Sequence, residues 1–171
     1  MTTPKPSPTA HPGYFQRYIA LVQETDLTEA FRNQRTALEK LLASINEEKS
    51  NYAYAEGKWT LKEVLQHIID AERIFNYRAL CFARGEKQNL PGFEENDYAL
   101  NSFAGNRKWD ELVKEFWAVR QSTEYLFGSF NSTVLENVGT ANSNTNTVSG
   151  IGFLTIGHCL HHQAIIKERY L

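Results

Sequence analysis

The chain has 171 residues, of which 42% are hydrophobic, 22% charged and 12% aromatic, a composition typical of one globular domain with a sizeable core. Its net charge of −2 argues against a nucleic-acid partner, because binding to phosphates requires a strongly basic surface. No apolar run approaches the roughly 20 residues of a membrane span, and the N-terminus lacks the apolar segment of a secretory signal. We therefore expect a cytoplasmic protein without a membrane partner.

The N-terminal segment is rich in proline, with four of the five prolines in the first twelve residues. This composition predicts a mobile leader over residues 1–13 and a single folded domain over residues 14–171. Residues 14–22 combine apolar and aromatic side chains. They are expected to form a short helix that lies across the rest of the domain.

Two long helices are predicted next, over Leu27–Ile45 and from Leu61 to about Arg84, because apolar residues recur there at helical spacing. Gly85 follows the second helix as a typical C-cap glycine. His67 lies within the apolar arc of the second helix and is expected to face the interior. Both helices should begin with a capping box, formed by Asp26 with Glu29 and by Thr60 with Glu63.

Residues 86–108 form the longest irregular stretch, and a connection of this length within a compact domain is usually functional or disordered. Its aromatic residues indicate a loop that folds over the helices: Phe93, Tyr98 and Phe103. Its acidic residues and one tyrosine suggest a lid over a site, although a solvated acidic loop is the simpler interpretation: Glu94, Glu95, Asp97 and Tyr98.

The second half of the chain predicts a third helix over Trp109–Phe130 and a fourth over Gly150–Leu171. Between them lies the polar sequence NVGTANSNTNTVSG, which has room for two extended segments. The chain shows no internal repeat and no convincing strand pattern. Four helices with long connections predict an all-α fold, a four-helix bundle.

Three of the five histidines fall within five positions of the fourth helix. His158 and His162 are four residues apart, so they lie about 40° apart in rotation and ~6 Å apart along the axis, on one inward face. His161 projects outside that face. The pair His158 and His162, together with His67, provides three neutral imidazoles, the ligand number of an open metal site. The alternative is one hydrogen-bonded core histidine and two incidental ones.

Three segments in this order resemble the DinB/YfiT-like superfamily of metal-dependent proteins: GKWTLKEVLQHIIDAERIFNYRALCFARGE, LPGFEENDYA and IGHCLHHQAIIKERYL. The resemblance extends from about Tyr14 to Leu171. It implies a four-helix bundle with a long crossover and a divalent metal held by His67, His158 and His162. Nitrogen ligands suit zinc or nickel best, with iron, copper or manganese as further candidates.

The resemblance also implies an activity. It indicates a small-molecule substrate and either hydrolysis or the transfer of a low-molecular-weight thiol such as bacillithiol or mycothiol, because an open divalent ion can activate water or a thiol. It implies a homodimer as well. The alternative is a non-catalytic bundle in which the metal joins two helices, acting as a binding or stress-response protein.

One position departs from the family pattern. Many members carry glutamate directly after the first histidine of the fourth helix, where this chain has Cys159. Any acid–base function of that glutamate is therefore missing at this position. Cys159 and Cys81 both lie in helical apolar patterns and are interpreted as small buried hydrophobic residues rather than as reactive thiols or a disulfide.

Three further side chains near His67 have two possible roles each. Asp70 and Glu63 are candidates to orient a ligand histidine, but surface carboxylates are the simpler interpretation. Arg78 projects on the same side of its helix as His67, about three turns further along. It could bind an anionic substrate or extend past the end of the bundle into solvent.

Overall fold

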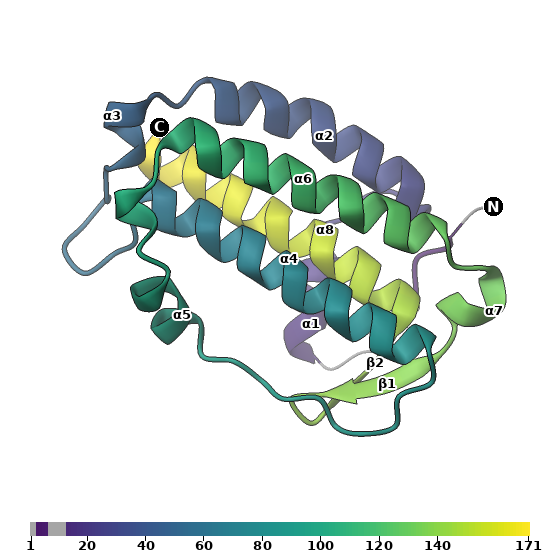
Figure 1. The fold of residues 1–171 in the computed structure, drawn as a ribbon. Coiled ribbons are helices and arrows are strands. Elements are labelled where there is room, and N and C mark those ends of the chain that lie inside the picture. The colour runs from purple at the N-terminus through teal and green to yellow at the C-terminus, as the bar shows by residue number, and fades with distance from the viewer. Residues whose placement is uncertain (1–2, 7–12) are drawn as a thin grey trace.

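The structure, a computed structural model, describes residues 3–6 and 13–171. Four long helices form a bundle (Figure 1): α2 (Leu27–Ala43), α4 (Leu61–Ala83), α6 (Trp109–Gly128) and α8 (Val148–Ile165). Helices α4 and α6 run in one direction, and α2 and α8 run in the opposite direction. This arrangement confirms the predicted all-α four-helix bundle, in which the connection from α4 to α6 must return along the length of the molecule.

Shorter elements surround the bundle: α1 (Gly13–Ile19), α3 (Glu47–Ser50), α5 (Glu95–Asn101), a 3-10 helix (Ala104–Asn106), α7 (Ser132–Leu135), β1 (Val138–Ala141), β2 (Asn144–Thr147) and a π-helical turn (Ile166–Tyr170). Within the described residues, no helix is long and apolar enough to cross a membrane. The connection between α4 and α6 passes the hairpin of β1 and β2, continues through α5 and follows the outside of α4 (Figure 1).

The hairpin of β1 and β2 was not expected as a sheet. Its two antiparallel strands pair Val138 with Thr147 and Ala141 with Asn144. The turn residues Asn142 and Ser143 have positive φ values of 49° and 58°, as the tight turns of two-residue hairpins require. The strands are only four residues long and mostly polar, so they show no clear alternation. Packing and turn geometry determine them instead of a hydrophobic pattern.

The predicted start and end of α4 are confirmed. The Thr60 hydroxyl accepts a hydrogen bond from the Glu63 amide, and the Glu63 carboxylate accepts one from the Thr60 amide at 2.7 Å. At the other end Gly85 has a φ of 84°, a conformation that glycine adopts without strain. The Glu86 amide then donates to the carbonyl of Cys81 at 3.0 Å, which closes the last turn.

The start of α2 differs in part from the expected capping box. One Asp26 carboxylate oxygen accepts from the Glu29 amide at 3.0 Å, as predicted for an N-cap. Its other oxygen accepts from the Thr3 amide at 2.6 Å, and Pro4 forms an isolated bridge with Asp26. Residues 3–6 of the expected leader are thus attached to the start of α2. Residues 1–2 and 7–12 of that leader lie outside the described part of the chain.

A buried ion pair holds three helices of the bundle together. Arg120 on α6 is fully buried and donates from Nε and Nη2 to the two carboxylate oxygens of Glu72 on α4, both at 2.9 Å. Its Nη1 donates to Gln34 on α2 at 2.6 Å. Thr123 adds a hydrogen bond to Glu72 at 2.6 Å. Because every charged atom has a partner, this pair can lie inside the core.

Candidate metal centre

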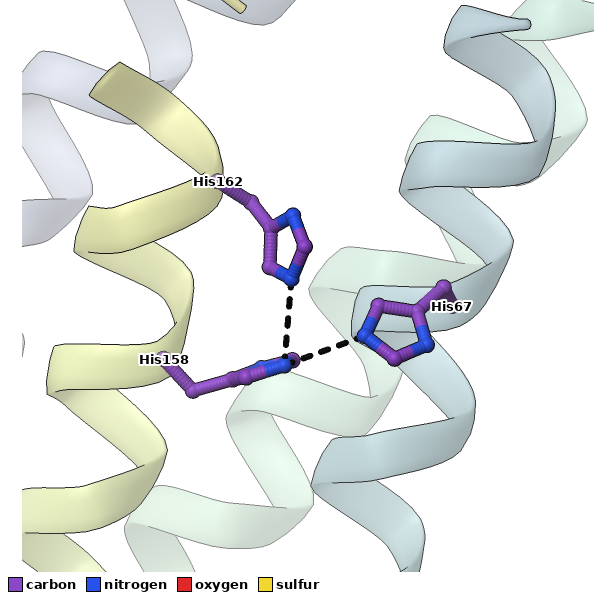
Figure 2. A group of neighbouring side chains, drawn as sticks. All are labelled: His67, His158 and His162. Atoms are coloured by element: carbon purple, nitrogen blue, oxygen red, sulfur yellow. Dashed lines mark hydrogen bonds between the residues drawn. The ribbon is translucent and has the colours of Figure 1, made fainter. Parts of the chain in front are cut away.

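Three histidine side chains converge between α4 and α8 (Figure 2). The Nε2 atom of His158 lies 3.1 Å from Nε2 of His67 and 3.2 Å from Nε2 of His162. One ring nitrogen from each residue lies within 4.8 Å of the others. Among the described residues, this cluster consists of His67, His158 and His162, and His161 lies outside it. The structure therefore brings together the three residues that the helical projection and the family resemblance had selected.

Close packing of α1 against α8 forms one wall of this site. A Cβ atom at Gly157 would lie 2.0 Å from the carbonyl oxygen of Tyr18, so only glycine permits this approach. The Tyr18 ring meets His158 edge-on at 5.6 Å, and Phe75 does the same at 5.6 Å. Trp59 lies 4.9 Å from the His67 ring. Aromatic rings therefore pack against two of the three imidazoles, those of His67 and His158.

Burial keeps all three imidazoles neutral at physiological pH. It lowers the pKa of His67 to about 4. It also lowers the pKa of His162 to about 3, with further effects of His67 and His161. The pKa of His158 falls well below its usual value for the same reason. Neutral imidazole is the form that binds a metal through a ring nitrogen.

The position of the His158 nitrogen between its two neighbours fits a shared cation. A neutral ring nitrogen carries either one proton or one lone pair, so Nε2 of His158 cannot form good hydrogen bonds with both of its neighbours. Two nitrogens that each lie about 2.0–2.1 Å from one ion, at tetrahedral or octahedral angles, are roughly 2.9–3.4 Å apart. The separations of 3.1 and 3.2 Å between His158 and its two neighbours fall within this range, and all three ring nitrogens lie within 4.8 Å of one another. A divalent ion would satisfy all three lone pairs.

A pocket of about 310 Å³ opens next to the histidines and is lined by His67 and His158. Its walls come from five parts of the chain, among them α1, the hairpin, and the end of the connection from α4 together with the first residue of α5. The other lining residues are Phe15, Tyr18, Ala71, Phe75, Arg78, Phe93, Glu94, Glu95, Asn142, Asn144 and Leu154. Arg78 therefore faces the pocket and does not extend past the end of the bundle. Glu94 and Glu95 border the pocket, whereas Asp97 and Tyr98 do not line it. All four side chains are exposed, as a solvated acidic loop predicts.

Comparison with known proteins places the chain in a family. Residues 30–166, most of the chain, match the DinB superfamily. The chain belongs to the DinB superfamily. The fold also resembles that of YfiT from Bacillus subtilis, with a TM-score of 0.65 at 15% identity over 90% of this chain and 84% of YfiT. YfiT is described as a probable metal-dependent hydrolase with an unusual four-helix bundle topology.

A second relative of this DinB-superfamily protein is a candidate metal-dependent hydrolase of Geobacillus thermodenitrificans, with 31% identity over 75 residues. That match covers 44% of this chain and 42% of the relative. The chain thus matches less than half the length of this relative. Both relatives are described as probable or candidate metal-dependent hydrolases.

Neither carboxylate considered as a partner for the histidines contacts them. Asp70 accepts a hydrogen bond from Gln66 at 2.9 Å and lies 3.7 Å from Arg73. Glu63 caps α4 through Thr60. Both side chains are half-buried and are engaged in structural contacts on α4.

Cys159, the position at which the family resemblance leads to the expectation of glutamate, lies next to the buried ion pair and does not line the pocket. Its side chain is 1% exposed. Burial raises the pKa of its thiol to about 11, although the charge of nearby Arg120 acts in the opposite direction. The presence of cysteine at position 159 therefore affects the surroundings of Arg120 and Glu72. It leaves the three converging imidazoles in place.

The two cysteines should consequently differ in reactivity. In the folded protein at pH 8 we expect Cys159 to resist alkylation by iodoacetamide, because its thiol is buried and protonated, whereas half-buried Cys81 should react. Mass spectrometry of tryptic peptides after timed alkylation measures both sites. Cys81→Ser and Cys159→Ser variants assign the signals, and fast labelling of Cys159 without unfolding would contradict the expectation.

Proposed function

We propose that this protein is a metal-dependent hydrolase that holds a divalent cation on His67, His158 and His162. The observation that supports this most strongly is the convergence of three neutral imidazole nitrogens beside a pocket. A purely structural site would be expected to have a fourth protein ligand. Among the described residues only these three side chains form such a cluster. Zinc or nickel fits the nitrogen ligands best.

The chemistry follows from an open site. A divalent ion on three imidazoles lowers the pKa of a bound water, or of a bound small thiol, and supplies a nucleophile at neutral pH. We favour water because both relatives are associated with hydrolysis. Tyr18 and Phe75 pack edge-on against His158, and Trp59 packs against His67. The pocket volume of about 310 Å³ suits a small-molecule substrate.

Metal content tests this proposal. Inductively coupled plasma mass spectrometry of the untagged protein should find close to one divalent metal per chain after reconstitution with zinc or nickel. His67→Ala and His162→Ala should lose most of it, because two imidazoles bind far more weakly than three. His161→Ala is the matched control, since His161 is adjacent in sequence but outside the cluster, and it should retain the metal. Equal metal content in all four proteins would refute the site.

A further inference from the structure

Arg78 is a buried cation without an acidic partner. Its side chain is 4% exposed. Among the described residues no carboxylate lies within 4.0 Å of its guanidinium, and its one hydrogen bond goes from Nη2 to the Pro91 carbonyl at 3.0 Å. Burial lowers its pKa, but a guanidinium remains charged in proteins. Buried charges are normally paired, so this one has unused capacity to bind an anion.

The same side chain lines the pocket beside the histidines. Arg78 follows His67 by eleven positions on α4, which places it about 20° away in rotation and roughly 16 Å further along the axis. Side chains on a helix lean toward its N-terminus, so Arg78 leans toward His67. The pocket lining also includes the apolar side chains of Phe75, Phe93 and Leu154 beside its polar residues. The pocket thus has a cation at one end and the imidazoles at the other.

The guanidinium is held in place before any ligand binds. Its bond to Pro91 attaches it to the segment that leaves α4. That segment is in turn joined to the hairpin, because the Leu90 amide donates to Thr140 at 2.9 Å and the Asn142 amide donates to Leu90 at 2.8 Å. A fixed, planar guanidinium with free N–H groups matches the two oxygens of a carboxylate.

We propose that Arg78 binds the carboxylate of an elongated substrate, whose apolar middle lies along Phe75 and Phe93 and whose reacting bond reaches His67 and His158. This inference rests on the proposed hydrolase function and adds the substrate class. A singly charged carboxylate is favoured over a multiply charged phosphate because Glu94 and Glu95 border the same pocket. Their negative charges repel a dianion more strongly than a monoanion.

Isothermal titration calorimetry on the full, zinc-reconstituted chain tests the inference, with 3-phenylpropionate as the probe and its neutral amide as the matched ligand. The wild type should bind the acid more tightly than the amide. Arg78→Met should weaken binding of the acid about tenfold or more, the usual effect of removing a charge-assisted hydrogen bond, and leave the amide unaffected. The affinity of Arg78→Lys for the acid should lie between those of the wild type and Arg78→Met.

A second variant avoids changing the buried residue. Glu95→Gln removes an exposed negative charge from the pocket border, so it should tighten binding of the acid about twofold, with a smaller effect at high salt. Equal affinity of wild type and Arg78→Met for the acid would overturn the inference, as would no preference for the acid over the amide. Unchanged acid binding in Glu95→Gln would count against it as well.

The test separates this inference from the proposed function. If the carboxylate bound at the histidines instead, His162→Ala would lose acid binding and Arg78→Met would not, which overturns the role of Arg78 alone. The proposed function fails only if the histidine variants keep their metal. Metal content of Arg78→Met should equal that of the wild type, because Arg78 lies about three turns of α4 away from His67.

Discussion

Glu72→Ala should lower the free energy of unfolding by about 3–5 kcal/mol, because it leaves the guanidinium of Arg120 charged and uncompensated inside the bundle. Arg120 is fully buried and Glu72 is 2% exposed. In the folded variant, the guanidinium of Arg120 cannot replace the lost contacts with bonds to water, because it is fully buried. Urea denaturation followed by circular dichroism measures the change.

Glu124→Ala provides the matched control for this prediction. Glu124 on α6 forms a different ion pair, with Arg35 on α2, through both carboxylate oxygens at 2.9 and 3.0 Å. That pair is partly exposed, with side chains 37% and 31% accessible, so its loss should cost about 1 kcal/mol or less. Replacing both buried charges, as in Glu72→Leu with Arg120→Met, should be less harmful than Glu72→Ala alone. A similar effect of Glu72→Ala and Glu124→Ala would contradict the argument.

Gly157→Ala should destabilise the protein by about 1–3 kcal/mol, the usual range for overpacking a core. The added methyl group would lie 2.0 Å from the Tyr18 carbonyl oxygen, and a backbone atom cannot rotate away as a side chain can. Helix α1 must therefore move away from α8. Because Tyr18 packs on His158, this movement also opens the wall of the candidate metal centre.

The sign of this effect is its most informative feature. Replacing glycine by alanine inside a helix normally stabilises it by up to about 1 kcal/mol. Gly128 is the last residue of α6 and is exposed, and a methyl group added there would meet no other part of the protein within 4 Å, so Gly128→Ala should be stabilising or neutral and not destabilising. Urea denaturation of both variants compares them directly. A stabilising effect at Gly157 would mean that α1 does not pack on α8 in this way.

Much of this protein follows from local sequence patterns. Helices α2, α4 and α6 carry apolar residues at helical spacing, whereas the first three turns of α8 are buried on every side. A capping residue such as Thr60 or a glycine such as Gly85 defines a helix end through bonds to residues only a few positions away. The inward direction of His67, His158 and His162 also follows from helical periodicity. These features depend on neighbours within about one turn of helix, so the sequence alone is sufficient to predict them.

Other features appear only when distant segments meet. The pairing of Arg120 with Glu72 joins residues 48 positions apart, and an arginine in a helix gives no local sign that it will be buried. The hairpin of β1 and β2 lacks the alternation of a typical strand, and the position of Arg78 in the pocket depends on the segment that follows α4.

The candidate metal centre combines both kinds of information. Periodicity determined which histidines face inward and that His158 and His162 share a face, because a helix fixes the direction of each side chain. Only the packing of α4 against α8 decided that His67 approaches His158 to 3.1 Å. The close approach of α1 at Gly157 and the rings of Phe75 and Trp59 then decided what surrounds them. Contact between helices depends on the shapes of many side chains at once, which no single segment of the sequence contains.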